Sequence, residues 1–110
     1  MRALRLAPAA GLALALVIVP AAGAELGDVS RGRTYAEAVC SGCHAIAPAA
    51  TMSPRSDATP FSVVSRTPGI NEQSLAVFLQ TSHASMPNLV VTGQNRDDLI
   101  AYIVSLRGTP

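Results

Sequence analysis

The sequence predicts an all-α fold with three main helices and irregular loops. Apolar residues recur at the spacing of one helix face over three stretches, at about residues 28–40, 71–81 and 96–107. No stretch alternates apolar and polar residues convincingly enough to predict a strand. Four prolines between the first two stretches predict an irregular loop, with a short helical turn at about residues 61–65.

The first two predicted helices begin at residues that suit an N-cap. Asp28 or Ser30 can cap the first helix and Asn71 the second, because short polar side chains accept hydrogen bonds from the free amides of a first turn. We expect the second helix to end before Met86-Pro87, since proline disfavours the helical conformation in the preceding residue.

The third helix has signals at both of its ends. Asn95 is a candidate cap, and Asp97 and Asp98 suit the positive end of the helix dipole. Gly108 suits the position just after the helix. The apolar stripe between these ends comprises Leu99, Tyr102, Ile103 and Leu106.

Residues 1–24 resemble a signal peptide rather than part of the fold. Arg2 and Arg5 supply a positive start, residues 12–19 supply an apolar core, and residues 22–24 form a small-residue cleavage site. The pattern therefore predicts that the chain is exported.

Cleavage after Ala24 would leave one domain, residues 25–110. The alternative is an uncleaved membrane anchor, since residues 6–24 nearly reach the length of a spanning helix. Pro8 and Pro20 favour removal. In both cases we expect the domain to lie in the periplasm, with a membrane contact only if the leader is kept.

The charge of the mature chain is nearly balanced. All eight basic residues are arginines and two of them lie in the leader, which leaves six against seven acidic residues. This balance excludes nucleic-acid binding, which requires a strongly basic surface. Contact with any partner should depend on local patches and apolar contacts rather than on a strong overall field.

The only two cysteines stand in the run Cys40-Ser41-Gly42-Cys43-His44. This C-x-x-C-H spacing is that of covalent haem attachment. Two cysteines on one side of a helical turn can bond to both vinyl groups of a porphyrin edge, and the next histidine can then bind the iron. The motif predicts one haem c, attached through Cys40 and Cys43, with His44 as an axial ligand.

Three other interpretations of the cysteine pair are a disulfide, a thioredoxin-like redox pair and half of a zinc site. A zinc site needs two further ligands, and beyond His44 only His83 is available besides carboxylates. A thioredoxin-like pair should follow a strand, and no strand is predicted before Cys40.

Over essentially the whole mature chain, the sequence resembles the class I cytochrome c family. The matching pieces are Gly32, the Cys40–His44 motif, Met86-Pro87 and residues 98–103 of the last helix. The resemblance implies that the first and last helices cross where Gly32 meets the Leu99/Tyr102 face.

Two details of the site also follow from this resemblance. It implies that the carbonyl of Pro48 orients His44. The family often has an aromatic residue four positions before the first cysteine, where this chain has Ala36 with Tyr35 alongside.

The resemblance implies that Met86 is the second axial ligand. Met52 is an alternative, but it lies only eight residues beyond His44 and would have to cross to the opposite haem face almost at once. His83 is another alternative, and a bis-histidine iron would have a lower potential. Met86 could also be an ordinary core residue.

These features predict a small periplasmic electron-transfer protein rather than an enzyme. We expect a monomer that exchanges electrons with redox protein partners. Two alternatives are a haem subunit bound to a dehydrogenase or oxidase, and a haem-based sensor or peroxidase-like protein with a labile sixth ligand.

Overall fold

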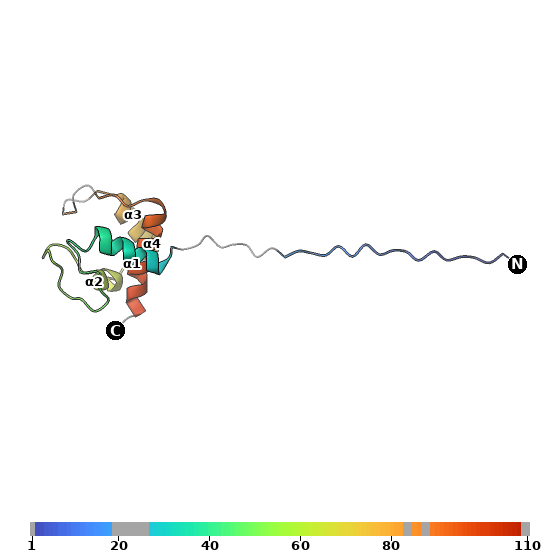
Figure 1. Ribbon diagram of the computed structural model, residues 1–110, viewed down its shortest axis with the longest axis horizontal. Helices are drawn as coiled ribbons and strands as arrows, with labels where there is room; N and C mark the ends of the chain where they lie inside the picture. Colours follow the sequence, from blue (N-terminus) through green and yellow to red (C-terminus); the bar gives the residue numbers. More distant parts are fainter. Residues whose placement is uncertain (1, 19–26, 83–84, 87–88, 109–110) are drawn as a thin grey trace.

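The computed structural model describes residues 2–18, 27–82, 85–86 and 89–108. Its helices are α1 (Val29–Val39), α2 (Phe61–Arg66), α3 (Glu72–Gln80), α4 (Gly93–Ser105) and the 3₁₀ turn η1 (Leu106–Gly108). The described residues contain no strand, and none of their helices is long and apolar enough to cross a membrane. The helices form one body, from which residues 2–18 extend (Figure 1). The expected cleavage site at 22–24 lies outside the described residues.

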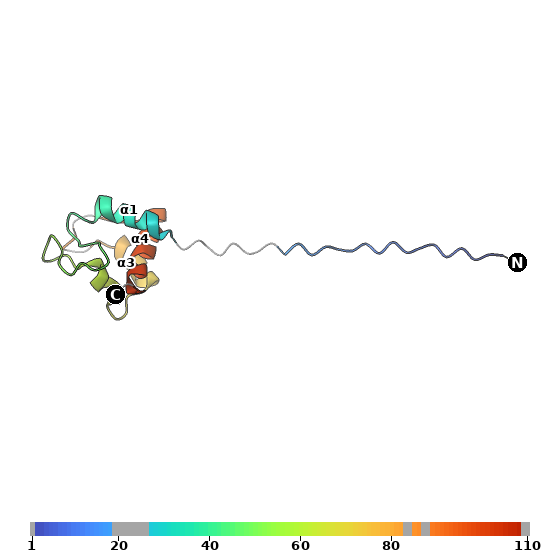
Figure 2. The ribbon, with the colours of Figure 1, turned by 60° about the horizontal axis from the view of Figure 1, so that its bottom comes forward.

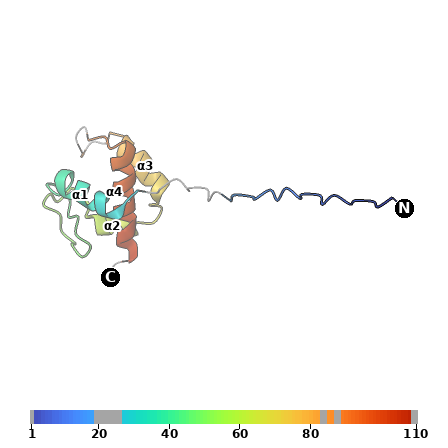
Figure 3. The same ribbon diagram turned by 45° about the vertical axis from the view of Figure 1, so that its right-hand side comes forward.

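Helices α1 and α4 cross at Gly32, as the resemblance implies. A Cβ atom on Gly32 would lie 1.9 Å from the carbonyl oxygen of Asp98 and 2.8 Å from the Cβ of Tyr102. Figure 3 shows α4 running along the body with α1 across it. Ala36, one turn further along α1, is fully buried. The crossing therefore depends on small residues of α1.

Helices α1 and α3 begin as predicted. The Asp28 carboxylate accepts a hydrogen bond of 2.8 Å from the Arg31 amide. Asn71 forms a reciprocal capping box with Ser74, in which the Asn71 side chain accepts from the Ser74 amide at 2.8 Å and the Ser74 hydroxyl accepts from the Asn71 amide at 2.9 Å. Helix α3 ends at Gln80, well before Met86.

The predicted start and end of the last helix are wrong. Helix α4 begins at Gly93 after the N-cap Thr92, so Asn95 lies inside the helix and is not its cap. Gly93 has a φ of 61°, a conformation that glycine tolerates better than other residues. The α-helix ends at Ser105 and tightens into η1, which contains Gly108. Gly108 is therefore not the residue just after the helix.

The loop between His44 and α2 is held to the helices by specific hydrogen bonds. The Tyr102 hydroxyl of α4 donates to the Ile46 carbonyl at 2.6 Å, and the Ser62 hydroxyl of α2 donates to the Ala50 carbonyl at 2.9 Å. The loop lies at the end of the body remote from residues 2–18 (Figures 1 and 2). The expected helical turn at 61–65 is confirmed as α2.

Candidate functional site

One cavity of about 530 Å³ gathers the residues that the sequence singles out. Cys40, Cys43, His44 and Met86 all line it. Its volume falls in the range of roughly 300–1,000 Å³ that is typical of small-molecule and cofactor sites. Its walls are mainly apolar and include Phe61, Leu75, Phe78, Leu79, Leu99 and Ile103. The cavity thus has the size and the lining that a large apolar cofactor requires.

The two cysteines lie on a turn that continues from the end of α1. Cys40 is the C-cap, and its carbonyl accepts hydrogen bonds from the amides of Cys43 at 3.1 Å and His44 at 2.9 Å. Cys40 is buried, Cys43 is exposed, and both thiols are free. This turn brings the two thiols and the imidazole to one wall of the cavity.

Burial raises the pKa of the Cys40 thiol to about 11, with a further contribution from the nearby Cys43. Cys40 is therefore protonated at neutral pH. A reactive redox pair requires the thiolate, and redox sites of this spacing lower the pKa of their cysteine. The raised pKa of Cys40 therefore disfavours the redox-pair interpretation. In the part of the chain that the structure describes, no group of three or more His, Cys, Asp or Glu side chains could hold a metal ion.

His44 is half-buried and held in one orientation. Its Nδ1 lies 2.7 Å from the Thr59 carbonyl oxygen, and its ring lies 5.2 Å from that of Phe61, centroid to centroid. Because a carbonyl can only accept, Nδ1 carries the proton and donates it. Nε2 is then the nitrogen with a free lone pair, which is the form that binds a metal.

The expectation that the Pro48 carbonyl orients His44 is wrong. The acceptor is Thr59, because the loop folds back so that the Arg55 amide donates to the Cys43 carbonyl at 3.2 Å. No local motif marks Thr59 as the acceptor, because the contact depends on how the loop folds back.

The structure distinguishes between Met86 and Met52, the two methionines that the sequence suggests as iron ligands. Met86 is half-buried and lines the cavity with His44. Met52 is 85% exposed and does not line the cavity. The structure thus brings only Met86 of these two to the site. The alternative ligand His83 and the neighbouring Pro87 lie outside the described residues.

An ion pair that the sequence analysis missed lies at the same cavity. Arg55 and Asp57 both line it, and their side chains meet through two hydrogen bonds, from Nε to Oδ1 at 3.1 Å and from Nη2 to Oδ2 at 2.9 Å. The Arg55 guanidinium lowers the pKa of the Asp57 carboxyl. The wall near Cys43 therefore carries two opposite charges that neutralise each other.

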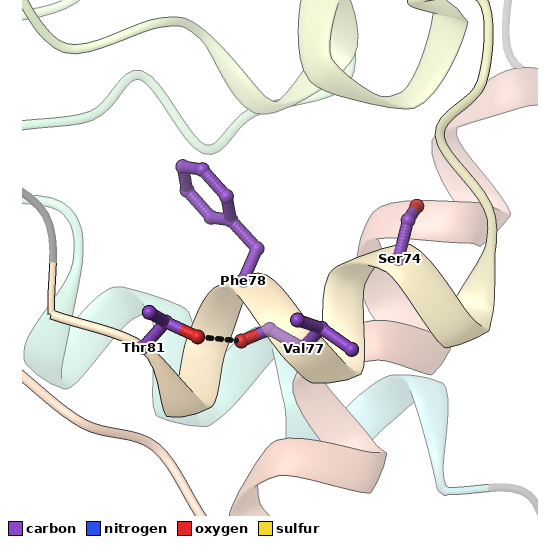
Figure 4. Close-up of a pocket in the computed structure, with 4 residues that line it drawn as sticks. All are labelled: Ser74, Val77, Phe78 and Thr81. Atoms are coloured by element: carbon purple, nitrogen blue, oxygen red, sulfur yellow. Dashed lines mark hydrogen bonds between the residues drawn. The ribbon is translucent and has the colours of Figure 1, made fainter.

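A second, shallower pocket lies on α3, next to the cavity. Its lining is Ser74, Val77, Phe78 and Thr81, and Phe78 also lines the cavity. Figure 4 shows the Phe78 ring projecting away from the helix, while the Thr81 hydroxyl donates to the Val77 carbonyl at 2.6 Å. The pocket is an apolar surface to which Val77 and Phe78 contribute.

A comparison with curated proteins finds similarity to Cytochrome c-552 of Bradyrhizobium diazoefficiens. The two sequences are 31% identical over 98 residues, which cover 88% of this chain and 93% of that protein. No protein-family model matches the chain. No solved structure matches it.

Proposed function

Since this chain belongs to the cytochrome c family and has its all-α fold, we propose that it is an electron carrier with one covalently attached haem. The observation that carries the proposal is that Cys40, Cys43, His44 and Met86 line one cavity. Bound there, haem supplies an iron that gains and loses a single electron. The protein supplies the attachment, the ligands and the surroundings.

Cys40 and Cys43 are the attachment points. Each thiol would add its sulfur and its hydrogen across one vinyl double bond of the haem, so that a thioether would form without any oxidant or reductant. His44 would bind the iron through Nε2, and Met86 would bind it through its thioether sulfur.

The same residues account for electron transfer without catalysis. With His44 and Met86 both bound to the iron, no position would remain on it for a substrate. A methionine ligand and an apolar lining would both raise the reduction potential, whereas the hydrogen bond from Nδ1 to the Thr59 carbonyl would make His44 a stronger electron donor to the iron and oppose that rise. Electrons would therefore enter and leave through the exposed edge of the haem, near the two cysteines.

Binding of carbon monoxide to the reduced holoprotein tests this proposal. A carrier with both axial positions closed should bind the gas slowly or not at all at neutral pH, and a redox titration should fit a single one-electron step. Rapid, stoichiometric binding would contradict the proposal and favour a sensor or a peroxidase-like protein. Elution only together with a larger enzyme would instead favour a haem subunit.

The proposal places the carrier in the periplasm as a monomer that meets other redox proteins. Its basis is the leader, residues 1–24, with its arginines, apolar stretch and small-residue end. The intact mass of the exported holoprotein should correspond to a chain that starts at Glu25 and carries one haem. A mass that includes the leader would show instead that the protein is anchored to the membrane.

A further inference from the structure

The ion pair at the cavity wall closes a tight turn. The Ala58 amide donates to the Arg55 carbonyl at 3.1 Å, and the paired hydrogen bonds between Arg55 and Asp57 join side chains of the same turn. Two parallel hydrogen bonds between a guanidinium and a carboxylate fix orientation as well as distance. The pair therefore restrains the backbone of residues 55–58.

Both ends of this turn contact the haem-binding motif. At the start of the turn, the Arg55 amide donates to the Cys43 carbonyl at 3.2 Å. Just after it, the Thr59 carbonyl accepts the 2.7 Å hydrogen bond from Nδ1 of His44. Arg55, Asp57 and Thr59 all line the cavity. The restrained turn is therefore anchored to the Cys43 carbonyl at its start and is followed directly by Thr59, which accepts the hydrogen bond from His44.

We propose that Arg55 and Asp57 are positioning residues for His44, because their ion pair holds the turn that presents the Thr59 carbonyl to Nδ1. The proposal rests on the proposed function, in which His44 binds the iron. Exposed ion pairs contribute little to global stability, and both side chains are about half exposed. The effect of the pair should therefore be seen in the properties of His44 rather than in the unfolding of the protein.

A firm acceptor at Nδ1 strengthens electron donation from the imidazole to the iron and so favours the oxidised iron. Loss of either partner should loosen the turn, weaken this hydrogen bond and raise the reduction potential. The two charges alone predict something different. Without a positioning role, Arg55→Gln removes a positive charge and lowers the potential, whereas Asp57→Asn removes a negative charge and raises it.

The test compares Arg55→Gln and Asp57→Asn with the parent holoprotein. The measurements are the reduction potential and, by NMR of the reduced protein, the solvent exchange of the His44 Nδ1 proton. We expect both variants to have a higher potential than the parent, which for Arg55→Gln requires the effect of positioning to exceed that of the lost charge. Exchange should be faster by a factor of roughly five or more, as for the loss of one ordinary hydrogen bond. Shifts of opposite sign with unchanged exchange would overturn the proposal, and so would no shift in either variant.

A matched control is the ion pair between Arg33 and Glu37 on α1. Its two side chains are also exposed, its Nε to Oε1 distance is 3.0 Å, and neither residue lines the cavity. Arg33→Gln and Glu37→Gln should leave the exchange of the His44 proton unchanged, and a change there as large as in the test variants would overturn the specific role of Arg55 and Asp57. The spectrum of the parent tests the proposed function separately, since it reports the ligation of His44 before any variant is compared.

Discussion

Asp98 is a buried carboxylate whose ionised form the fold stabilises. Its oxygens accept hydrogen bonds from Nε of Arg31 at 2.9 Å, from the Asp28 amide at 2.7 Å and from the Gln94 amide group at 2.8 Å. The Arg31 guanidinium and then the Asp28 amide hold the pKa of Asp98 well below its usual range. The carboxylate therefore ties the start of α1 to α4.

This lowered pKa predicts how stability depends on pH. The stabilisation is complete above the ordinary carboxyl pKa of about 4 and is lost as the pH falls below it, because the unfolded chain then takes up the proton first. We expect Asp98→Asn to be less stable than the parent at pH 7, and its stability to fall less steeply between about pH 5 and pH 3. Denaturant unfolding of the holoprotein at several pH values measures both effects.

The control for this prediction is Glu37→Gln. Glu37 belongs to an exposed pair on α1 with Arg33, and exposed pairs contribute little to stability. The free energy of unfolding of Glu37→Gln should change with pH in the same way as that of the parent. A curve for Asp98→Asn that is also parallel to the parent at every pH would show that Asp98 gains nothing from its ionised form.

The next scale is that of the helices, where the crossing of α1 and α4 leaves no room for a side chain. A Cβ on Gly32 would lie 1.9 Å from a backbone oxygen, which cannot rotate away as a side chain could. We expect Gly32→Ala to lower the free energy of unfolding by about 2 kcal/mol or more. Gly108→Ala is the matched control, because a Cβ there meets nothing within 4 Å. Equal stability of the two variants would contradict this description of the crossing.

Helix α4 shows why a helix boundary is hard to predict. The apolar stripe from Leu99 to Leu106 identifies the helix correctly, since the core imposes that spacing. Its first turn has no such signal, because residues 93–96 are exposed or only half-buried and contain no apolar side chain. The helix begins at Gly93, whose positive φ cannot be read from the spacing of apolar residues.

On the scale of the whole molecule, the core and the cavity are built from the same residues. Leu75, Leu79, Leu99 and Ile103 belong to the buried core and also line the cavity. The chain is short and has few aromatic residues to fill its centre. A large apolar group in the cavity would therefore complete the core, and helices from both ends of the chain would contact it.

The sequence predicts those parts of the candidate site that depend only on the spacing of neighbouring residues along the chain. The spacing of Cys40, Cys43 and His44 places them on one turn, and that turn lines the cavity as expected. The acceptor of His44 could not be predicted in the same way, because it depends on how the loop folds back. The Arg55–Asp57 pair was missed for the same reason, since an arginine two residues from an aspartate carries no signal of its own.

The most direct test of the central claim is the absorption and magnetic spectrum of Met86→Ala beside that of the parent. The parent should show a low-spin haem with histidine and methionine as ligands. The variant should lose this signature, because Met86 is the methionine that lines the cavity while Met52 is exposed. An unchanged histidine and methionine spectrum in Met86→Ala would contradict the account.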